Sequence, residues 1–509
     1  MHFVVIAAFA LVLTARTPTK SWWLFTSIPL TYVFVTAQIV GIVVVATVTS
    51  VWVIRRLNRR PWNPDWAQRL FSKSNVVLRL FLLSSLALDV LLTPWLVVVR
   101  REWGLDRWVA VDDLAAMLPF FVGVVLCWIA QYPAERAIRR LSAERSSVVE
   151  GTARHVWRLG EYLLFNIRHQ LLLIVVPMGG ILIAYDLAAK YSTQLYRWTH
   201  LEFAEQAALM LAAGGMFIIS PAILRYVWST SVLTSGGLRT RLQNICDHIR
   251  LRYREILVWR SDGVVVNAAV MGLIPSLRYI LLSDGLLESM NERQVEAVFG
   301  HEAGHVKHLH IHFYLLFAAF SMLLVGGVLW LVWEFLPFEF WHRWLGISRL
   351  EWSSTLDLLA MVLVLLCWIV GFGWVSRRFE RQADVFGVRC VGWNIRECTP
   401  DCRVHNTPDR AEADRHALCA AAAEVFAEAL HRIAILNGIA PHARSWRHSS
   451  IASRMDFVRA LARDPTRLRR FNRTVVLTKT VLLLGTLVGC AIGAYLYWPT
   501  EFVRYWFGR

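Results

Sequence analysis

Long apolar segments recur along the chain and constrain its fold more than any other feature of the sequence. They cover residues 3–14, 22–54, 76–99, 114–130, 171–189, 207–227, 313–333, 356–374 and 475–498. Most have about 20 residues, which is the length that an α-helix needs to cross the hydrocarbon core of a bilayer. The sequence therefore predicts a polytopic α-helical membrane protein with about eight or nine spans.

Two of these segments differ from the rest in length. Residues 3–14 are short for a span and lack the basic start of a signal peptide, so we keep them as one more candidate helix. Residues 22–54 are longer than a bilayer requires, and we expect that helix to be tilted or partly interfacial.

Positive charge gathers at the ends of the apolar segments. The formal net charge is +17 at pH 7, and basic residues form short runs such as "RRLNRRPW" from Arg55 and "RAIRR" from Arg136. This distribution is typical of the cytoplasmic loops of membrane proteins. A nucleic-acid-binding protein would instead gather its basic residues on one face of a domain. The expected partner of these charges is membrane lipid, and no nucleic acid is expected.

The same charges predict the orientation of the chain. If the Arg-rich loops at residues 55–75 and 134–170 are cytoplasmic, alternate counting places residues 228–309 and 376–474 in the cytoplasm as well. Nearly all of the basic residues are arginine, which is typical of a GC-rich bacterial genome. The sequence therefore predicts a multi-pass protein of a bacterial inner membrane.

The two cytoplasmic segments flank one pair of spans, and we expect them to fold together as a single domain that is split in the sequence. Its first half, residues 231–310, contains two strand-like runs, "DGVVVNAAV" and "LRYILLSDGLL", and its second half, residues 376–470, is largely helical. A transmembrane hairpin at residues 311–375 separates the halves. A transmembrane bundle at residues 1–230 precedes them, and a last transmembrane helix at residues 471–509 follows. The predicted domain is mainly α-helical with a small sheet, an α+β fold.

The stretch "AVFGHEAGHVKHLHIHFYLLF" from Ala297 contains the pattern His-Glu-x-x-His. On a helix, His301 and His305 stand one turn apart on one face, so both imidazoles can bind one metal ion. Glu302 lies beside them and can take a proton from a metal-bound water. Zinc suits this arrangement because it lowers the pKa of bound water to about 7. The short pattern also occurs by chance, so it favours a zinc site without establishing one.

Three further histidines, His308, His310 and His312, follow in the same stretch. We expect the helix to continue into the apolar segment, which places these histidines at the boundary between water and lipid. We interpret them as interfacial or supporting residues and not as metal ligands.

A third ligand is expected in "SRRFERQADVFG", which follows the second span of the hairpin. Glu380 and Asp384 are four residues apart and so share one face of a helix. The hairpin would return this helix to the side of the membrane that holds His301. Glu380 would then complete a His₂Glu ligand set, and Asp384 would hydrogen-bond an imidazole N–H. The alternative is an ordinary solvated helix with charges four residues apart, which for Glu380 alone is the simpler interpretation.

Four segments, "NAAVMG", "RYILLSDGLL", "AVFGHEAGHVKHLH" and "SRRFERQAD", together resemble the zinc metallopeptidases of peptidase family M48. That family includes the CAAX prenyl proteases and the HtpX-type membrane proteases. The resemblance implies a zincin-like metallopeptidase domain with one catalytic Zn²⁺ ion. It also implies that His301, His305 and Glu380 bind the metal, and that Glu302 and Asp384 are catalytic.

The resemblance covers roughly residues 238–461 and also concerns the substrate. The Asn-Ala strand of the family matches Asn267 and Ala268, which implies a substrate that binds as an added strand. The segment "RHSSIASRMDFV" resembles the family's His-Pro-x-x-x-x-Arg pattern, with a serine in place of the usual proline. Its His448 and Arg454 are thereby implied to face the scissile carbonyl or its oxyanion.

These features predict an integral-membrane zinc endopeptidase similar to the CAAX prenyl proteases, with its active site at the cytoplasmic membrane surface. Its substrate would be a peptide or protein that is lipidated or embedded in the membrane. One alternative is an HtpX-like enzyme that degrades damaged membrane proteins. Another is a sensor or transporter that holds zinc without proteolysis, which Asp89 and Asp186 inside apolar segments would support. The simpler interpretation of those two acids is a polar contact between helices.

The segment "RCVGWNIRECTPDCRVHNTPDRAEADRHALC" departs from the family pattern. The side chains in it that can in principle hold a second, structural zinc are Cys398, Cys402, His405, His416 and Cys419. Their spacing is not that of a standard zinc finger or ribbon. We therefore expect a plain surface insertion there.

Overall fold

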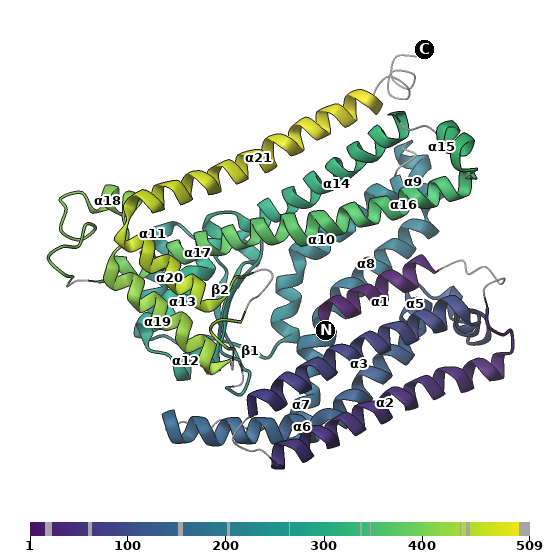
Figure 1. Ribbon diagram of the computed structural model, residues 1–509, viewed down its shortest axis with the longest axis horizontal. Coiled ribbons are helices and arrows are strands. Elements are labelled where there is room, and N and C mark those ends of the chain that lie inside the picture. Colours follow the sequence, from purple (N-terminus) through teal and green to yellow (C-terminus); the bar gives the residue numbers. More distant parts are fainter. Residues whose placement is uncertain are drawn as a thin grey trace. The chain divides into compact units, whose positions relative to one another are not determined.

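The computed structural model describes residues 1–15, 23–59, 64–150, 156–200, 204–263, 265–335, 338–346, 348–395, 398–437, 439–443 and 448–497. The chain divides into two compact units (Figure 1). The first contains residues 1–231 and 259–264, and the second contains residues 232–258 and 265–509.

Among the described residues, eight helices are long and apolar enough to cross a membrane. They cover Ile28–Arg59, Arg69–Leu92, Leu118–Leu141, Leu159–Lys190, Ala204–Val227, His310–Phe335, Leu359–Trp393 and Pro465–Tyr495. Each overlaps a predicted apolar segment, and the short first segment forms the helix Phe3–Leu13. The beginning of segment 22–54 and the end of segment 475–498 lie outside the described residues. The chain is therefore an integral multi-pass membrane protein, as predicted.

The first unit is built mainly from long helices (Figure 1). They are α1 (His2–Thr14), α2 (Ile28–Arg59), α3 (Pro64–Leu92), α4 (Trp95–Val97), α5 (Val111–Ala116), α6 (Leu118–Glu150), α7 (Leu159–Asn166), α8 (Leu173–Lys190), α9 (Ser192–Thr199) and α10 (Ala204–Val227). Helices α2, α3 and α6 pack against one another, and α8 packs against α10. A π-helical turn, Ile167–Leu172, joins α7 to α8, so that the two form one apolar helix.

The two acids inside apolar segments both make polar contacts within this unit. Asp89 on α3 accepts a hydrogen bond from the side chain of Gln38 on α2, with 2.6 Å between Nε2 and Oδ1. Asp186 on α8 accepts one from the backbone N–H of Ala110 at 2.7 Å. Ala110 immediately precedes α5, so Asp186 satisfies a backbone donor at the beginning of that helix. Each carboxylate thus joins two segments, which agrees with the simpler interpretation.

The second unit combines a small sheet with short and long helices (Figure 1). Its elements are α11 (Gly237–Ile249), β2 (Glu255–Trp259, up to Val258), β3 (Ala268–Met271), β4 (Tyr279–Ser283), α12 (Asp284–Ser289), α13 (Glu292–Lys307), α14 (His310–Phe335), α15 (Phe338–Leu345), α16 (Arg349–Leu366), α17 (Gly373–Trp393), α18 (Arg410–His416), α19 (Ala420–Leu436), α20 (Ile451–Arg463) and α21 (Pro465–Tyr497). The division between the units falls within β1 (Thr230–Val232), after Ser231. The strand order is β1-β2-β4-β3, and β3 runs antiparallel to β4 with Ala268 opposite Leu282. Strand β4 is buried along its whole length, whereas β3 is an edge strand.

The core of the second unit lies between the sheet and helices α13, α17 and α19. Its buried side chains include Ile256, Leu282, Phe299, Phe426 and Leu461. Helix α13 begins at a capping box, as its sequence indicates. The side chain of Asn291 accepts from the N–H of Gln294 at 2.9 Å, and the side chain of Gln294 accepts from the N–H of Asn291 at 3.3 Å. This pair of hydrogen bonds fixes the start of the helix that carries His-Glu-x-x-His.

Long apolar helices continue from this core. Helices α14 and α16 form the predicted hairpin through α15, and α21 packs along α14. A π-helical turn, Cys367–Phe372, joins α16 to α17. The returning span therefore continues without a break into the helix that carries Glu380 and Asp384.

Candidate metal centre

Helices α13 and α17 approach each other closely because glycine occupies their contact surface. A Cβ atom on Gly300 would lie 2.7 Å from Cβ of Cys390, and one on Gly304 would lie 3.1 Å from the Cα of Ala383. Real Cβ contacts are longer than the first of these distances. The absence of side chains at these two positions therefore lets the His-Glu-x-x-His helix lie against the helix that carries Glu380.

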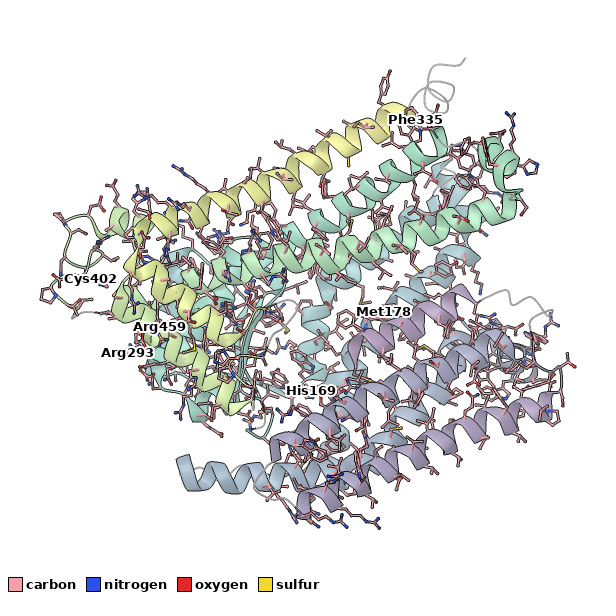
Figure 2. All side chains as sticks on the ribbon, viewed as in Figure 1. His169, Met178, Arg293, Phe335, Cys402 and Arg459 are labelled. Atoms are coloured by element: carbon pink, nitrogen blue, oxygen red, sulfur yellow. The ribbon has the colours of Figure 1, made fainter. Side chains whose placement is uncertain are left out.

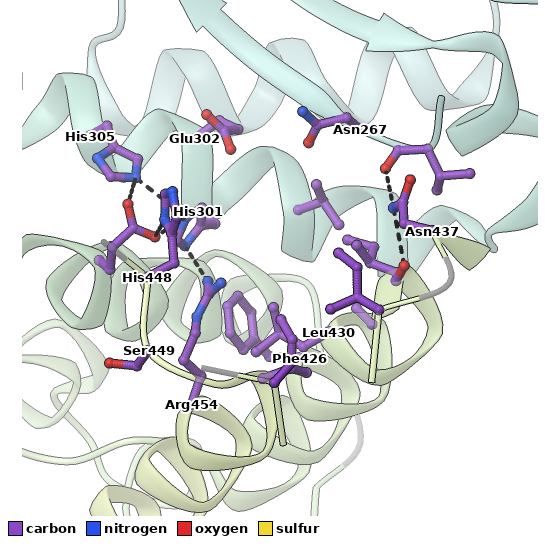
Figure 3. A pocket seen from close by; sticks show the side chains of 18 of the residues that line it. Asn267, His301, Glu302, His305, Phe426, Leu430, Asn437, His448, Ser449 and Arg454 are labelled. Atoms are coloured by element: carbon purple, nitrogen blue, oxygen red, sulfur yellow. Dashed lines mark hydrogen bonds and ion pairs between the residues drawn. The ribbon is translucent and has the colours of Figure 1, made fainter. Parts of the chain in front are cut away.

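Three predicted ligands converge in the space between these helices (Figure 3). The Nε2 atoms of His301 and His305 lie 3.3 Å apart, and each is 3.7 Å from a carboxylate oxygen of Glu380. Four-coordinate zinc with bonds of about 2.0–2.1 Å requires about 3.3 Å between neighbouring ligand atoms. The donor types and their separations therefore fit one tetrahedral Zn²⁺ ion with a position left for water.

Asp384 and Arg454 orient the first of these imidazoles. An oxygen of Asp384 lies 2.9 Å from Nδ1 of His301, so the Nδ1–H donates to it and the Nε2 lone pair faces the metal position. Arg454 in turn binds both oxygens of Asp384, at 3.0 Å through Nε and 2.5 Å through Nη2. Asp384 is fully buried and Arg454 nearly so. The guanidinium of Arg454 thus offsets the cost of burying the Asp384 carboxylate, which the imidazole of His301 needs as its hydrogen-bond acceptor.

This pairing changes the position expected for Arg454. Its guanidinium lines the pocket, but its closest contacts are the two oxygens of Asp384, and Nη2 also lies 3.4 Å from Nδ1 of His301. His448 lies closer to the metal position, because its Nδ1 is 2.9 Å from an oxygen of Glu380. The preceding segment, residues 444–447, lies outside the described residues. Of the two residues in the His-x-x-x-x-x-Arg segment, His448 is the one that contacts the candidate ligand Glu380.

The prediction that one continuous helix runs from His301 into the membrane span is wrong. Helix α13 ends at Lys307, and α14 begins at His310. Leu309 between them has a left-handed φ of 57°, and Lys479 on α21 donates to the carbonyl of His308 at 2.8 Å. Lys479 thus satisfies a carbonyl at the end of α13. The break at Leu309 changes the direction of the chain before the apolar segment begins.

The break brings His310 to His305, the second imidazole of the candidate metal centre. Its Nδ1 lies 2.9 Å from Nδ1 of His305, and its Nε2 lies 3.0 Å from Oε1 of Gln382 on α17. In an uninterrupted helix, a residue five positions on would face about 140° away. Sequence periodicity therefore gave no signal for this contact, although His310 was among the residues interpreted as supporting.

The environment of the site shifts the pKa values of several of its titratable groups, among them Glu302 and His305. In the metal-free chain, burial raises the pKa of Glu302 to about 7, which is the range of a carboxylate that exchanges protons near neutral pH. Burial lowers the pKa of His305 to about 4, and the neighbouring His301 acts in the same direction. His305 is therefore neutral at pH 7, the form in which imidazole binds a metal.

A pocket of about 630 Å³ opens onto these groups. One wall is apolar and comes from α19, with Phe426, Leu430 and Ile433 (Figure 3). The opposite border is Asn267, which is exposed just before the edge strand β3. Asn267 and Ala268 therefore lie at the edge of the sheet, beside the pocket that contains Glu302 and the candidate metal ligands.

The alternation of backbone groups along β3 defines its free edge. The carbonyl of Asn267 accepts from the N–H of Ser283 on β4 at 3.0 Å. In an antiparallel pair, the backbone groups of the next residue point the other way. The N–H and C=O of Ala268 are thus directed toward the open side of the sheet, where an added strand can bind them.

Residues 233–397 match Peptidase family M48, so the resemblance inferred from the motifs is confirmed for this segment. A curated "Protease HtpX homolog" from Pyrobaculum calidifontis is 30% identical over 186 residues, which are 35% of this chain and 51% of that protein. A second from Archaeoglobus fulgidus is 27% identical over 140 residues, 26% of this chain and 39% of that protein. The chain thus spans about half the length of these relatives, or less.

One solved structure is similar over much of the chain. The crystal structure of S. mikatae Ste24p covers 82% of this chain and 98% of its own, with a TM-score of 0.36 and 14% identity.

Proposed function

We propose that the protein, whose residues 233–397 match Peptidase family M48, is an integral-membrane zinc endopeptidase. In this proposal the halves at residues 231–310 and 376–470 form the catalytic domain, and the hairpin at residues 311–375 anchors it. The site faces the cytoplasm, at the inner membrane of a bacterium. The observation that carries the proposal is the convergence of His301, His305 and Glu380 within bonding range of one ion.

Zinc at this position would polarise the scissile carbonyl and make the attacking water acidic enough to ionise at neutral pH. Glu302 lines the same pocket, where it would accept the proton of the attacking water and donate it to the leaving amine. Asp384 holds His301 in the required tautomer, and Arg454 holds Asp384. His448 lies at the rim of the site, where its imidazole can donate to the developing oxyanion.

The substrate in this proposal is an extended peptide. Its backbone pairs with the free edge of β3 at Ala268, and Asn267 binds it at the end of the strand. A side chain next to the scissile bond enters the pocket beside Phe426 and Leu430. The apolar wall favours an apolar side chain, as in membrane-embedded segments or lipid-linked termini.

Two substrate classes follow from this chemistry. Both curated relatives described above are named as HtpX homologs, which favours proteins of the membrane as substrates. The CAAX-type alternative requires a lipidated C-terminus. Cleavage of a farnesylated peptide and of an unfolded membrane protein by the same preparation separates the two classes.

Zinc dependence tests the proposal itself. The purified full chain should hydrolyse peptides, lose activity on dialysis against a chelator and regain it with added Zn²⁺. Glu380→Gln should lose the catalytic metal, whereas Glu302→Gln should keep it. A protein that binds zinc through His301 and His305 but cleaves neither class of substrate would instead favour the sensor or transporter alternative.

A further inference from the structure

A second group of metal-binding side chains lies outside the proposed active site. It belongs to the segment between α17 and α19, which we expected to be a plain surface insertion. The structure brings together Cys398, Cys402, His405 and Cys419, one ligand atom of each lying within 4.8 Å of all the others. His416, the other histidine of this segment, is not part of the group. Figure 2 labels Cys402 in the loop that precedes α18.

The separations within the group suit a tetrahedral ion. The Sγ atoms of Cys398 and Cys419 are 3.5 Å apart, and Sγ of Cys402 is 3.3 Å from Nδ1 of His405. Zinc bonds of about 2.3 Å to sulfur and about 2.0–2.1 Å to nitrogen place neighbouring ligand atoms about 3.5–3.8 Å apart. All three cysteines are free thiols. These two separations are therefore within a few tenths of an ångström of those that one ion requires, and all four ligand atoms lie within 4.8 Å of one another.

The remaining nitrogen of the histidine has a partner that orients the ring. Nε2 of His405 lies 2.9 Å from the carbonyl oxygen of Gly392, near the end of α17. Because a carbonyl can only accept, Nε2 carries the proton, and Nδ1 presents its lone pair toward Cys402. A histidine that binds a metal usually makes such a hydrogen bond through its other nitrogen.

Burial also distinguishes this group from a set of exposed surface residues. Cys402 is 8% exposed and Cys419 is 3% exposed, and both belong to the hydrophobic core of the second unit. Cys419 immediately precedes α19, and Gly392 lies in the last turn of α17. The group thus connects the end of one helix of the proposed active site to the beginning of another.

We propose that Cys398, Cys402, His405 and Cys419 bind a structural Zn²⁺ ion. Three thiolates and one imidazole form a closed site of the kind that holds zinc structurally, with no position left for a substrate. The ion fastens the insertion to α17, which carries Glu380, and to α19, which forms the apolar wall of the pocket. The ion thereby fixes the spacing between the last turn of α17 and the start of α19, away from the part of α17 that carries Glu380.

Metal analysis and X-ray absorption of the purified full chain test this proposal. The wild type should hold about two zinc ions, and its zinc spectrum should contain Zn–S bonds of about 2.3 Å beside Zn–N and Zn–O bonds. Cys402→Ser should lose about one equivalent together with the sulfur signal. His416→Ala and Cys490→Ser are matched controls, since neither residue belongs to the group, and both should keep the full zinc content and the sulfur signal.

A third variant guards against loss of folding. His405→Cys replaces one zinc ligand by another, and it should retain the metal while the sulfur number of this site rises from about three to about four. The Zn–S signal is independent of proteolysis, so it remains a valid result even if the proposed peptidase activity is not found. Conversely, activity without a Zn–S signal would leave the proposed function intact and refute the second site.

Several results would overturn the proposal. The first is zinc without sulfur ligands in the wild type, and the second is iron in place of zinc. The third is a disulfide between Cys398 and Cys419, detected by mass spectrometry of protein that was purified in the presence of a reductant. Retention of the full Zn–S signal in Cys402→Ser would also refute it. Each of these outcomes is measured on the same preparations.

Discussion

The Nδ1 atoms of His305 and His310 lie 2.9 Å apart, and the ring of His310 stacks on Phe379 with 4.5 Å between centroids. If Nε2 of His305 binds the metal, its Nδ1 carries the proton and donates to His310. Nε2–H of His310 then donates to Gln382, which is the one proton arrangement that satisfies all three groups. This series of hydrogen bonds from Gln382 through His310 thus fixes the tautomer and the orientation of His305, a proposed metal ligand.

We expect His310→Phe to weaken zinc binding about 10- to 100-fold, because it keeps the stacked ring but removes both nitrogens. Competition with a chromogenic chelator measures the affinity. His312→Ala is the control, since His312 is exposed two residues further on, and its affinity should equal that of the wild type. Equal affinities for His310→Phe and wild type would show that His310 does not support the ligand.

Removal of only one partner of the buried ion pair between Arg454 and Asp384 should destabilise the fold. Arg454→Met leaves a fully buried carboxylate without its cation, and we expect a loss of about 3–5 kcal/mol in the free energy of unfolding. The control is Arg459→Met on the same helix, where an exposed pair with Glu424 contributes at most about 1 kcal/mol. Thermal unfolding in detergent compares the two. A similar shift for both variants would contradict the assigned role of Arg454.

Much of the metal centre could be predicted from sequence, and the reasons are local. His301, Glu302 and His305 follow from the helical repeat, and the capping box at Asn291 fixes the start of their helix. Glu380 required one further step, because a hairpin must return its helix to the same side. These inferences depend on periods and span lengths, which the sequence carries directly.

The sequence could not reveal contacts that depend on tertiary packing or on an interruption of a helix. Leu309 is an ordinary helix-forming residue, so nothing in the pattern indicates its left-handed conformation. The fork of Arg454 on Asp384 joins positions 70 residues apart. The cysteines of the insertion have no standard spacing, and only the fold brings Cys398 next to Cys419.

The close approach of α13 and α17 can be tested at Gly300. A methyl group there would lie 2.7 Å from Cβ of Cys390, so we expect Gly300→Ala to push the helices apart. Overpacking of this kind costs about 1–3 kcal/mol of stability, and the separated ligands should bind zinc less tightly. Gly326→Ala on α14 is the matched control, because no atom lies within 4 Å of its added methyl group. Unchanged zinc affinity in Gly300→Ala would show that the glycine contact does not position the ligands.

Pairing of the substrate with β3 can be tested on the substrate itself. A series of peptides, each with one backbone N–H methylated, should lose about 2- to 10-fold in kcat/KM at alternate positions, since only every second residue faces the strand. The positions between them should be unaffected and serve as internal controls. A uniform effect along the peptide, or none, would argue against an added strand at Ala268.

The most direct test of the proposed function compares Glu302→Gln with the wild type in zinc content and in peptide hydrolysis. The glutamine has the same size and cannot accept the proton of the attacking water. The proposal requires unchanged zinc content with a rate lowered by about 10²- to 10⁴-fold. A Glu302→Gln protein that holds its zinc and cleaves peptides at the wild-type rate would contradict the mechanism.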